Sequence, residues 1–320
     1  MKFTEEKLKQ MAQPLSDTEN DKCLHAIKAI RDALKPLGYY STTGDEVGII
    51  TEGSHAYSVR MKKHYSTEDI EIFVQGSYAN NTCVRGESDV DIAVVRHDMF
   101  EYAFGKQFSP YVGGFEHKSD AMRFKDTVQR ALNECFSSWN VHRHNKSIKV
   151  DGNSYRKQAD VVPAISIRYF YDSDNDNYNS YSEGITIISD DGQVINNFPK
   201  QHIINGRKKN INTDHYYKKM VRIIKKMRYM MEDLHYGSAG KVSSFGLESL
   251  LWNVPDDLFT KYGIYRYIFD DVVDYLYQNK SYLYIYKEAN GIKKLCPTSI
   301  DVGNYSKFID DLHGFYQYDI

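Results

Sequence analysis

The most constraining feature of this 320-residue sequence is a pair of carboxylates at the start of an apolar run. Asp89 and Asp91 flank Val90 and lead into the apolar residues 92–95. Residues two apart on a strand project from the same face, so the two carboxylates point together while their neighbours point into the core. Adjacent carboxylates repel each other and are costly to desolvate unless a cation compensates their charge. The pair predicts a site for a hard divalent ion such as Mg²⁺, which prefers oxygen ligands.

A Gly-Ser pair lies twelve residues before the first of these aspartates. Gly76 and Ser77 follow a strand pattern at residues 70–75 and precede a short segment that we expect to begin a helix. Glycine lets the backbone pass close to a phosphate, and the exposed N–H groups at the start of a helix favour anions. A serine hydroxyl can donate to a phosphate oxygen. This position between two apolar strands predicts phosphate binding.

A third carboxylate stands inside a later apolar run. Asp160 lies between Ala159 and the residues 161–164, which have the pattern of a buried strand. Alone, it would be interpreted as a hydrogen-bonded structural aspartate. Together with Asp89 and Asp91 it predicts three carboxylates on adjacent strands, which fits a two-metal site with ions roughly 4 Å apart.

The order of Gly76-Ser77, Asp89-x-Asp91 and Asp160 resembles the active-site motif of the polymerase-β-like nucleotidyltransferases. Over residues 65–305 the sequence is more narrowly similar to the bacterial cGAS/DncV-like nucleotidyltransferases. The segments that carry this narrower resemblance are residues 75–85, Asn197 to His202, Asn205-Gly206, Lys209-Asn210, Val221 to Lys225 and Ser243 to Pro255.

The resemblance implies an α+β fold. A polymerase-β-like nucleotidyltransferase sheet lobe is expected to pack against a C-terminal helical lobe, with the active site in the cleft. We place the nucleotidyltransferase core lobe, with its N-terminal helices, at residues 1–212 and the helical lobe at residues 213–320. The N-terminal helices could pack on both lobes.

The resemblance also implies roles for individual residues. The expected ligands of two Mg²⁺ ions, with Mn²⁺ as an alternative, are Asp89, Asp91 and Asp160. The expected nucleotide-binding residues are Gln75, Gly76, Ser77, Lys225 and Ser244. Within this set, Gly76 and Ser77 hold the β- and γ-phosphates of the donor, Lys225 reaches the triphosphate, and Ser244 touches phosphate or sugar. Either Tyr78 or Phe245 could stack on a base, or both could be core residues.

The activity implied by the resemblance is synthesis of a cyclic di- or oligonucleotide from NTPs, with release of pyrophosphate, in antiphage (CBASS) signalling. The product is expected to bind a separate downstream effector, which does not bind the enzyme itself. The sequence leaves open which bases are joined, the 2′-5′ or 3′-5′ linkage, the ring size, and whether a partner or phage ligand gates the enzyme.

Two alternatives use the same fold: an RNA or tRNA 3′-end nucleotidyltransferase, and a non-signalling antitoxin-type nucleotidyltransferase. The first needs a basic channel for its acceptor strand. The basic clusters Arg207 to Lys209, Lys218-Lys219 and Lys225-Lys226 are interpreted instead as solvated faces. An intact acid triad argues against a non-catalytic module, since without catalysis three acids would remain uncompensated.

Charge and hydropathy narrow the expected partners. The sequence contains 41 Lys and Arg residues against 43 Asp and Glu residues. This balance excludes a protein that coats nucleic acid through a generally basic surface. No run of 18 apolar residues and no signal-peptide pattern is present, so we expect no membrane partner. We also expect a cytoplasmic monomer without stably bound nucleic acid.

Three further features of the sequence lie outside the motif. The acidic segment from Asp172 to Glu183 has the spacing of a calcium loop, but it lacks flanking helical patterns and is interpreted as a solvated loop of unassigned role. Trp139 and Trp252 are expected in the core. Many of the 27 tyrosines lie in the helical C-terminal part and are expected to pack half-buried there, with a polar tip.

Overall fold

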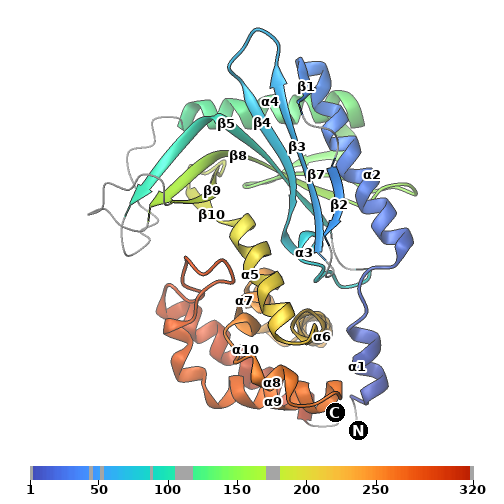
Figure 1. Cartoon of the computed structure of the whole chain (residues 1–320), viewed down its shortest axis with the longest axis vertical. Coiled ribbons are helices and arrows are strands. Elements are labelled where there is room, and N and C mark those ends of the chain that lie inside the picture. Colours follow the sequence, from blue (N-terminus) through green and yellow to red (C-terminus); the bar gives the residue numbers. More distant parts are fainter. Residues whose placement is uncertain are drawn as a thin grey trace. The chain divides into compact units, whose positions relative to one another are not determined.

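The computed structural model describes residues 3–42, 46–50, 54–86, 89–104, 118–170 and 181–317. The chain divides into two compact units, and each is described by itself. The sheet unit comprises residues 16–79 and 89–200, and the helical unit comprises residues 1–15, 80–88 and 201–320. The α+β class, with a mixed sheet and a C-terminal helical region, is confirmed (Figure 1).

The sheet unit is built on ten strands within the described residues. They are β1 (Tyr39–Ser41), β2 (Glu46–Ile50), β3 (Ser54–Lys63), β4 (Asp69–Gln75), β5 (Val90–Phe104), β6 (Val141–Arg143), β7 (Ile148–Val150), β8 (Ala159–Phe170), β9 (Tyr181–Ile188) and β10 (Val194–Asn197). The main path runs β1-β3-β4-β5-β8-β7-β6, with β2 paired to β3, β9 to β8 and β10 to β9. Because β4 is antiparallel to β5 and β5 is parallel to β8, the end of β4 meets the starts of β5 and β8.

Two long helices, α2 (Asp17–Leu34) and α4 (Lys118–Phe136), pack against strands of the sheet and contact each other (Figure 1). A capping box stands at the start of α2: Ser16 Oγ accepts from the Glu19 amide, and Glu19 Oε2 accepts from the Ser16 amide. On the sheet, Ile165 packs against Ala121 of α4. Since strand residues alternate between faces, α4 covers the face opposite to that of Asp160.

The helical unit holds α1 (Glu5–Met11), α5 (Pro199–Asn212), α6 (Tyr216–Asp233), α7 (Ser244–Trp252), α8 (Asp257–Thr260), α9 (Tyr265–Gln278) and α10 (Ser299–Gln317). Only the first two residues of α5 belong to the sheet unit. The apolar face of α6 packs into the core of this unit, where Met220, Ile223, Ile224 and Met227 are all fully buried.

The contacts group most of α5 and residues 1–15 with the helical unit. One expectation differs from the structure. The prediction that Trp139 lies in the core is wrong: α4 ends at Phe136, Ser137 has a positive φ of 68°, and Trp139 is 86% exposed. The helical spacing of apolar residues runs from Phe124 through Leu132 to Trp139 in the sequence, but the helix itself ends at Phe136. Trp252 packs partly buried against the core, as expected.

Candidate active site

Strand register brings three of the predicted site residues into one row. Gln75 of β4 pairs with Asp91 of β5, and Asp91 pairs with Asp160 of β8. Directly paired residues project from the same face of a sheet, so the amide and the two carboxylates stand side by side. Asp89 lies just before β5 and is part of the same end of the sheet. Within the row, Asp91 and Asp160 are 69 positions apart in the sequence.

The row concentrates negative charge. Burial raises the pKa of Asp160, and the negative charge of Asp89 raises it further. Gln158 Nε2 donates a hydrogen bond to Asp89 Oδ2 (2.6 Å), which holds that carboxylate next to the start of β8. Such a group of like charges is stabilised by a bound cation.

The backbone of Gly76 lies directly against Asp91. Gly76 begins α3 (Gly76–Ala79) with a φ of +64°, in the left-handed region. A Cβ at this position would overlap Asp91 Oδ2. Both the conformation and the close approach therefore require glycine, and they fix Gly76 and Ser77 beside the row of carboxylates.

The donor set fits a hard divalent cation, because it offers carboxylate oxygens in a negatively charged, half-buried setting. In the described part of the chain, no three histidine, cysteine, aspartate or glutamate side chains are grouped so that they could hold an ion together. Strand register places Asp91 next to Asp160, and the effect of Asp89 on the pKa of Asp160 shows that these two carboxylates are also near each other. The three carboxylates are not arranged so that they surround a common point.

Lys225 and Ser244 belong to the helical unit. Lys225 is 2% exposed, and its Nζ donates to the Thr82 carbonyl (3.2 Å), to Thr82 Oγ1 (3.3 Å) and to Glu248 Oε1. These three bonds use all of its N–H groups. Ser244 is the first residue of α7, and its Oγ accepts from Arg228 Nη1 (3.3 Å). The expected contact of Lys225 with phosphate is not available in this arrangement.

We call the buried group around Glu248 the Glu248 cluster: Glu248, Lys225, His202 and Thr82. His202 Nε2 donates to Glu248 Oε2 (3.0 Å), and Thr82 Oγ1 donates to Glu248 Oε1 (2.6 Å). Burial alone would raise the pKa of Glu248, but the charge of Lys225 and the hydrogen bond from His202 lower it well below its usual range. The cluster fixes Thr82, which lies between Ser77 and Asp89 in sequence.

The expectation that the basic clusters are solvated is wrong for three of their lysines. Lys209 is 8% exposed and forms an ion pair with Asp256, while Lys218 and Lys225 are 3% and 2% exposed. Burial of these groups within the helical unit removes much of the surface charge that an RNA channel would use.

The two candidate stacking residues differ in exposure. Tyr78 is 2% exposed and is therefore a core residue in this structure. Phe245 is 39% exposed and contacts the His202 ring. Most of the acidic segment 172–183 lies outside the described residues.

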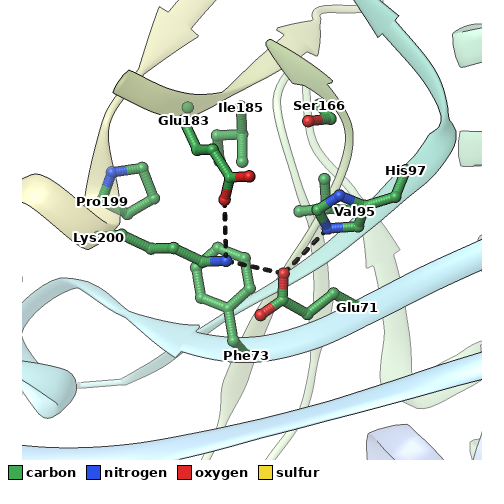
Figure 2. Close-up of a pocket in the computed structure, with 10 residues that line it drawn as sticks. Glu71, Phe73, Val95, His97, Ser166, Glu183, Ile185, Pro199 and Lys200 are labelled. Carbon is green, nitrogen blue, oxygen red and sulfur yellow. Dashed lines mark hydrogen bonds and ion pairs between the residues drawn. The ribbon is translucent and has the colours of Figure 1, made fainter. Parts of the chain in front are cut away.

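A pocket that the sequence reasoning missed lies on the sheet unit (Figure 2). Glu71, His97 and Lys200 line this pocket, and Ser58 bonds to Glu71 from outside it; we call these four residues the Glu71 cluster. His97 Nε2 and Lys200 Nζ each donate to Glu71 Oε2 (2.9 Å), and Ser58 Oγ donates to Oε1 (2.7 Å). The sequence signal that could have revealed this pocket is Glu71, a charged residue inside the apolar pattern of β4. It lies four positions before Gln75 and therefore on the same face of the strand.

Two family matches cover most of the described chain. Residues 58–167 match the nucleotidyltransferase domain, and residues 204–317 match the C-terminal helical domain of cGAS/DncV-like nucleotidyltransferases. A cyclic GMP-AMP synthase, CdnE03 of Staphylococcus schleiferi, is 40% identical over 99% of this chain and 98% of its own length.

The chain belongs to the cGAS/DncV-like nucleotidyltransferases. A second member of this family, the cyclic dipyrimidine nucleotide synthase CdnE of Cecembia lonarensis, is 35% identical over 87% of this chain and 84% of its own. The structure of the Elizabethkingia meningoseptica CdnE cyclic dinucleotide synthase with GTP and Apcpp is similar with a TM-score of 0.74, at 31% identity, and covers 99% of this chain and 100% of that one.

These matches confirm the predicted family and the prediction of an enzyme, a nucleotidyltransferase of the cyclic nucleotide synthase type. In the described residues no helix has the length and apolar character needed to span a membrane.

Proposed function

We propose that this enzyme joins nucleoside triphosphates into a cyclic dinucleotide and releases pyrophosphate. The observation that carries the proposal is the row of Gln75, Asp91 and Asp160 across three adjacent strands, with Gly76 pressed against Asp91. A site that groups carboxylates next to a close-approach glycine suits the transfer of a nucleotidyl group from a triphosphate to a hydroxyl.

In this proposal, Asp89, Asp91 and Asp160 are the ligands of two divalent ions, Mg²⁺ or Mn²⁺. When bound, such ions activate an attacking hydroxyl and neutralise the leaving pyrophosphate. Gly76 lets the donor phosphates approach the backbone, and the Ser77 hydroxyl donates to a phosphate oxygen. Gln158 orients the Asp89 carboxylate through its hydrogen bond.

The substrates that we propose are GTP and ATP. The support is that the Staphylococcus schleiferi relative is named for a cyclic GMP-AMP product and that the Elizabethkingia meningoseptica structure holds GTP and Apcpp. We further propose that the enzyme acts as a cytoplasmic monomer in antiphage (CBASS) signalling, and that its product activates a separate effector.

The test is to incubate the protein with the four labelled NTPs, singly and in pairs, with Mg²⁺ or Mn²⁺. A phosphatase-resistant product from GTP with ATP is expected, because a closed ring has no terminal phosphate. Replacing both aspartates of the motif (Asp89→Ala with Asp91→Ala) should abolish turnover without changing the circular dichroism spectrum.

The matched control is Asp126→Asn, which changes an exposed aspartate on α4, over the opposite face of the sheet. It should retain full activity. Turnover that persists in the double variant, or a product that grows only when RNA is added, contradicts the proposal.

A further inference from the structure

The row of paired residues continues beyond Asp160 onto two further strands. On β7, Lys149 pairs with Asp160, and on β6, His142 pairs with Lys149. Directly paired residues of antiparallel strands project from the same face, with Cβ atoms about 5 Å apart. One face of the sheet therefore carries, in order, Gln75, Asp91, Asp160, Lys149 and His142. A cation thus stands on the far side of Asp160 from Asp91.

The packing of β7 fixes the direction in which Lys149 points. Its neighbours Ile148 and Val150 are buried, and β7 contacts α4, which covers the face opposite to that of Asp160. Because strand residues alternate between faces, Lys149 must project to the face of the aspartates. Its side chain is half-buried there, which limits how far the ammonium can turn into solvent.

Lys149 has no carboxylate of its own. Its side chain forms no ion pair or hydrogen bond within the described part of the chain. Its charge nevertheless reaches Asp160: burial and the charge of Asp89 raise the pKa of that carboxyl, and the charges of Lys149 and His144 lower it. The ammonium therefore acts on Asp160 through space, without binding either of its oxygens.

A divalent ion held by Asp160 would lie close to this ammonium. Neighbouring strands are about 4.8 Å apart, so an ion on the Asp160 carboxylate and the Lys149 ammonium are separated by roughly 5–8 Å. Two positive charges at this distance repel each other, and in a half-buried setting the repulsion is screened less than in bulk water. Lys149 thus opposes the binding of a cation that the aspartates favour.

We propose that Lys149 is a positioning residue that lowers the affinity of the Asp160 ion site, so that this site fills when a triphosphate substrate adds its own negative charge. The inference rests on the proposed function, in which Asp160 is an ion ligand. Without nucleotide, the attraction of the carboxylates is partly cancelled by the ammonium. A bound triphosphate restores the attraction, and the ion then enters when there is a substrate to use it.

The experiment measures Mn²⁺ binding to nucleotide-free protein by electron paramagnetic resonance of the free ion. It compares wild type with Lys149→Met and with Lys149→Arg, which keeps the charge. The matched control is Lys146→Met, because Lys146 is an exposed lysine of the turn between β6 and β7 and does not shift the pKa of Asp160. Each titration is run at low and at high KCl concentration. Turnover gives a second readout, the free Mg²⁺ concentration for half-maximal rate at saturating NTP.

Lys149→Met is expected to bind Mn²⁺ about 3- to 30-fold more tightly than wild type, since the repulsion between an ammonium and a divalent ion at this distance has that size. The gain should shrink at high KCl, because salt screens the repulsion. The half-maximal Mg²⁺ concentration should fall in the same direction. Lys149→Arg and the control should both stay within about twofold of wild type.

The sign of the change separates this role from others. Weaker Mn²⁺ binding by Lys149→Met would mean that Lys149 only supports the fold, and unchanged binding with a raised KM for NTP would mean that it contacts the substrate; either result overturns the inference. A gain that persists unchanged when Asp160→Asn is added would place the ion elsewhere and also overturns it.

Failure of the proposed function looks different. The wild-type protein then yields no cyclic product from any NTP mixture. The Mn²⁺ titrations use no nucleotide, so they still decide whether Lys149 weakens an ion site at Asp160.

Discussion

The two units each contain a glutamate bound by a lysine, a histidine and a hydroxyl, yet the two clusters differ in their access to solvent. In the Glu71 cluster the lysine side chain is 37% exposed, and in the Glu248 cluster it is 2% exposed. The same four chemical groups thus form a solvent-open pocket in one unit and a closed ion pair in the other. Residue composition alone does not distinguish a solvent-accessible ion pair from a closed one, whereas the exposure of the lysine does.

Both carboxylates are kept ionised for the same reason. Burial opposes the charge of Glu71, but the hydrogen bond from His97 and the charge of Lys200 outweigh it and lower its pKa to about 2. Glu248 follows the same rule in a fully buried setting, with Lys225 and His202 as partners. The difference lies in what happens when a partner is removed: water can replace Lys200, but it cannot reach Lys225.

The largest effect is expected for Glu248→Ala. This variant leaves the Lys225 ammonium buried without its counter-charge, which costs about 3–5 kcal/mol of unfolding free energy. Urea unfolding followed by circular dichroism measures the loss. The control is Glu232→Ala, an exposed glutamate of α6 whose removal should change stability by less than about 0.5 kcal/mol. A loss below about 1 kcal/mol for Glu248→Ala would show that water reaches the cluster.

A double-mutant cycle compares the two lysine-glutamate pairs directly. We expect a coupling energy of about 2–3 kcal/mol between Lys225 and Glu248, and below about 1 kcal/mol between Lys200 and Glu71, since solvent screens the more exposed pair. Single and double variants (K225M with E248Q; K200M with E71Q) are unfolded in urea. Equal coupling energies in the two cycles would remove the distinction between a closed and an open cluster.

Stability should also depend on pH through Glu71. Its pKa is lower in the folded protein, about 2, than its ordinary value of 4.5. The unfolded chain therefore takes up the proton first, and stabilisation present above pH 4.5 is lost as the pH falls toward 2. Between pH 5 and 2.5, wild type should lose on the order of 1–2 kcal/mol more than Glu71→Gln. Parallel pH curves for the two proteins would contradict this assignment.

The smallest effect on stability is expected for Lys200→Met. Its control is Lys63→Met, because Lys63 has a similar exposure (35%) and also pairs with a glutamate. Because Lys200 is partly exposed, its removal should cost less than about 1 kcal/mol. Thermal melting of the variant beside Lys63→Met checks this. A loss as large as that of Glu248→Ala would mean that Lys200 is a structural anchor.

The chemistry of the sheet unit could be read from local patterns. A strand has a period of two, so Asp89-x-Asp91 had to present both carboxylates on one face, and an apolar run marked the buried strand after it. The capping box of Ser16 and the apolar face of α6 follow equally local rules. Trp139 was misplaced because helical spacing says nothing about where a helix ends.

The sequence by itself determined the family, the order of the motifs and the side of each strand that carries charge. Only the tertiary structure decided that Asp91 pairs with Asp160, that Gly76 touches Asp91, and that Lys225 is closed in with Glu248. The physical reason is one of range. Periodicity reports which face of an element is buried, but partners far apart in sequence are chosen by strand register and packing. For a charged side chain, those distant partners decide whether it is buried and paired or open to a ligand.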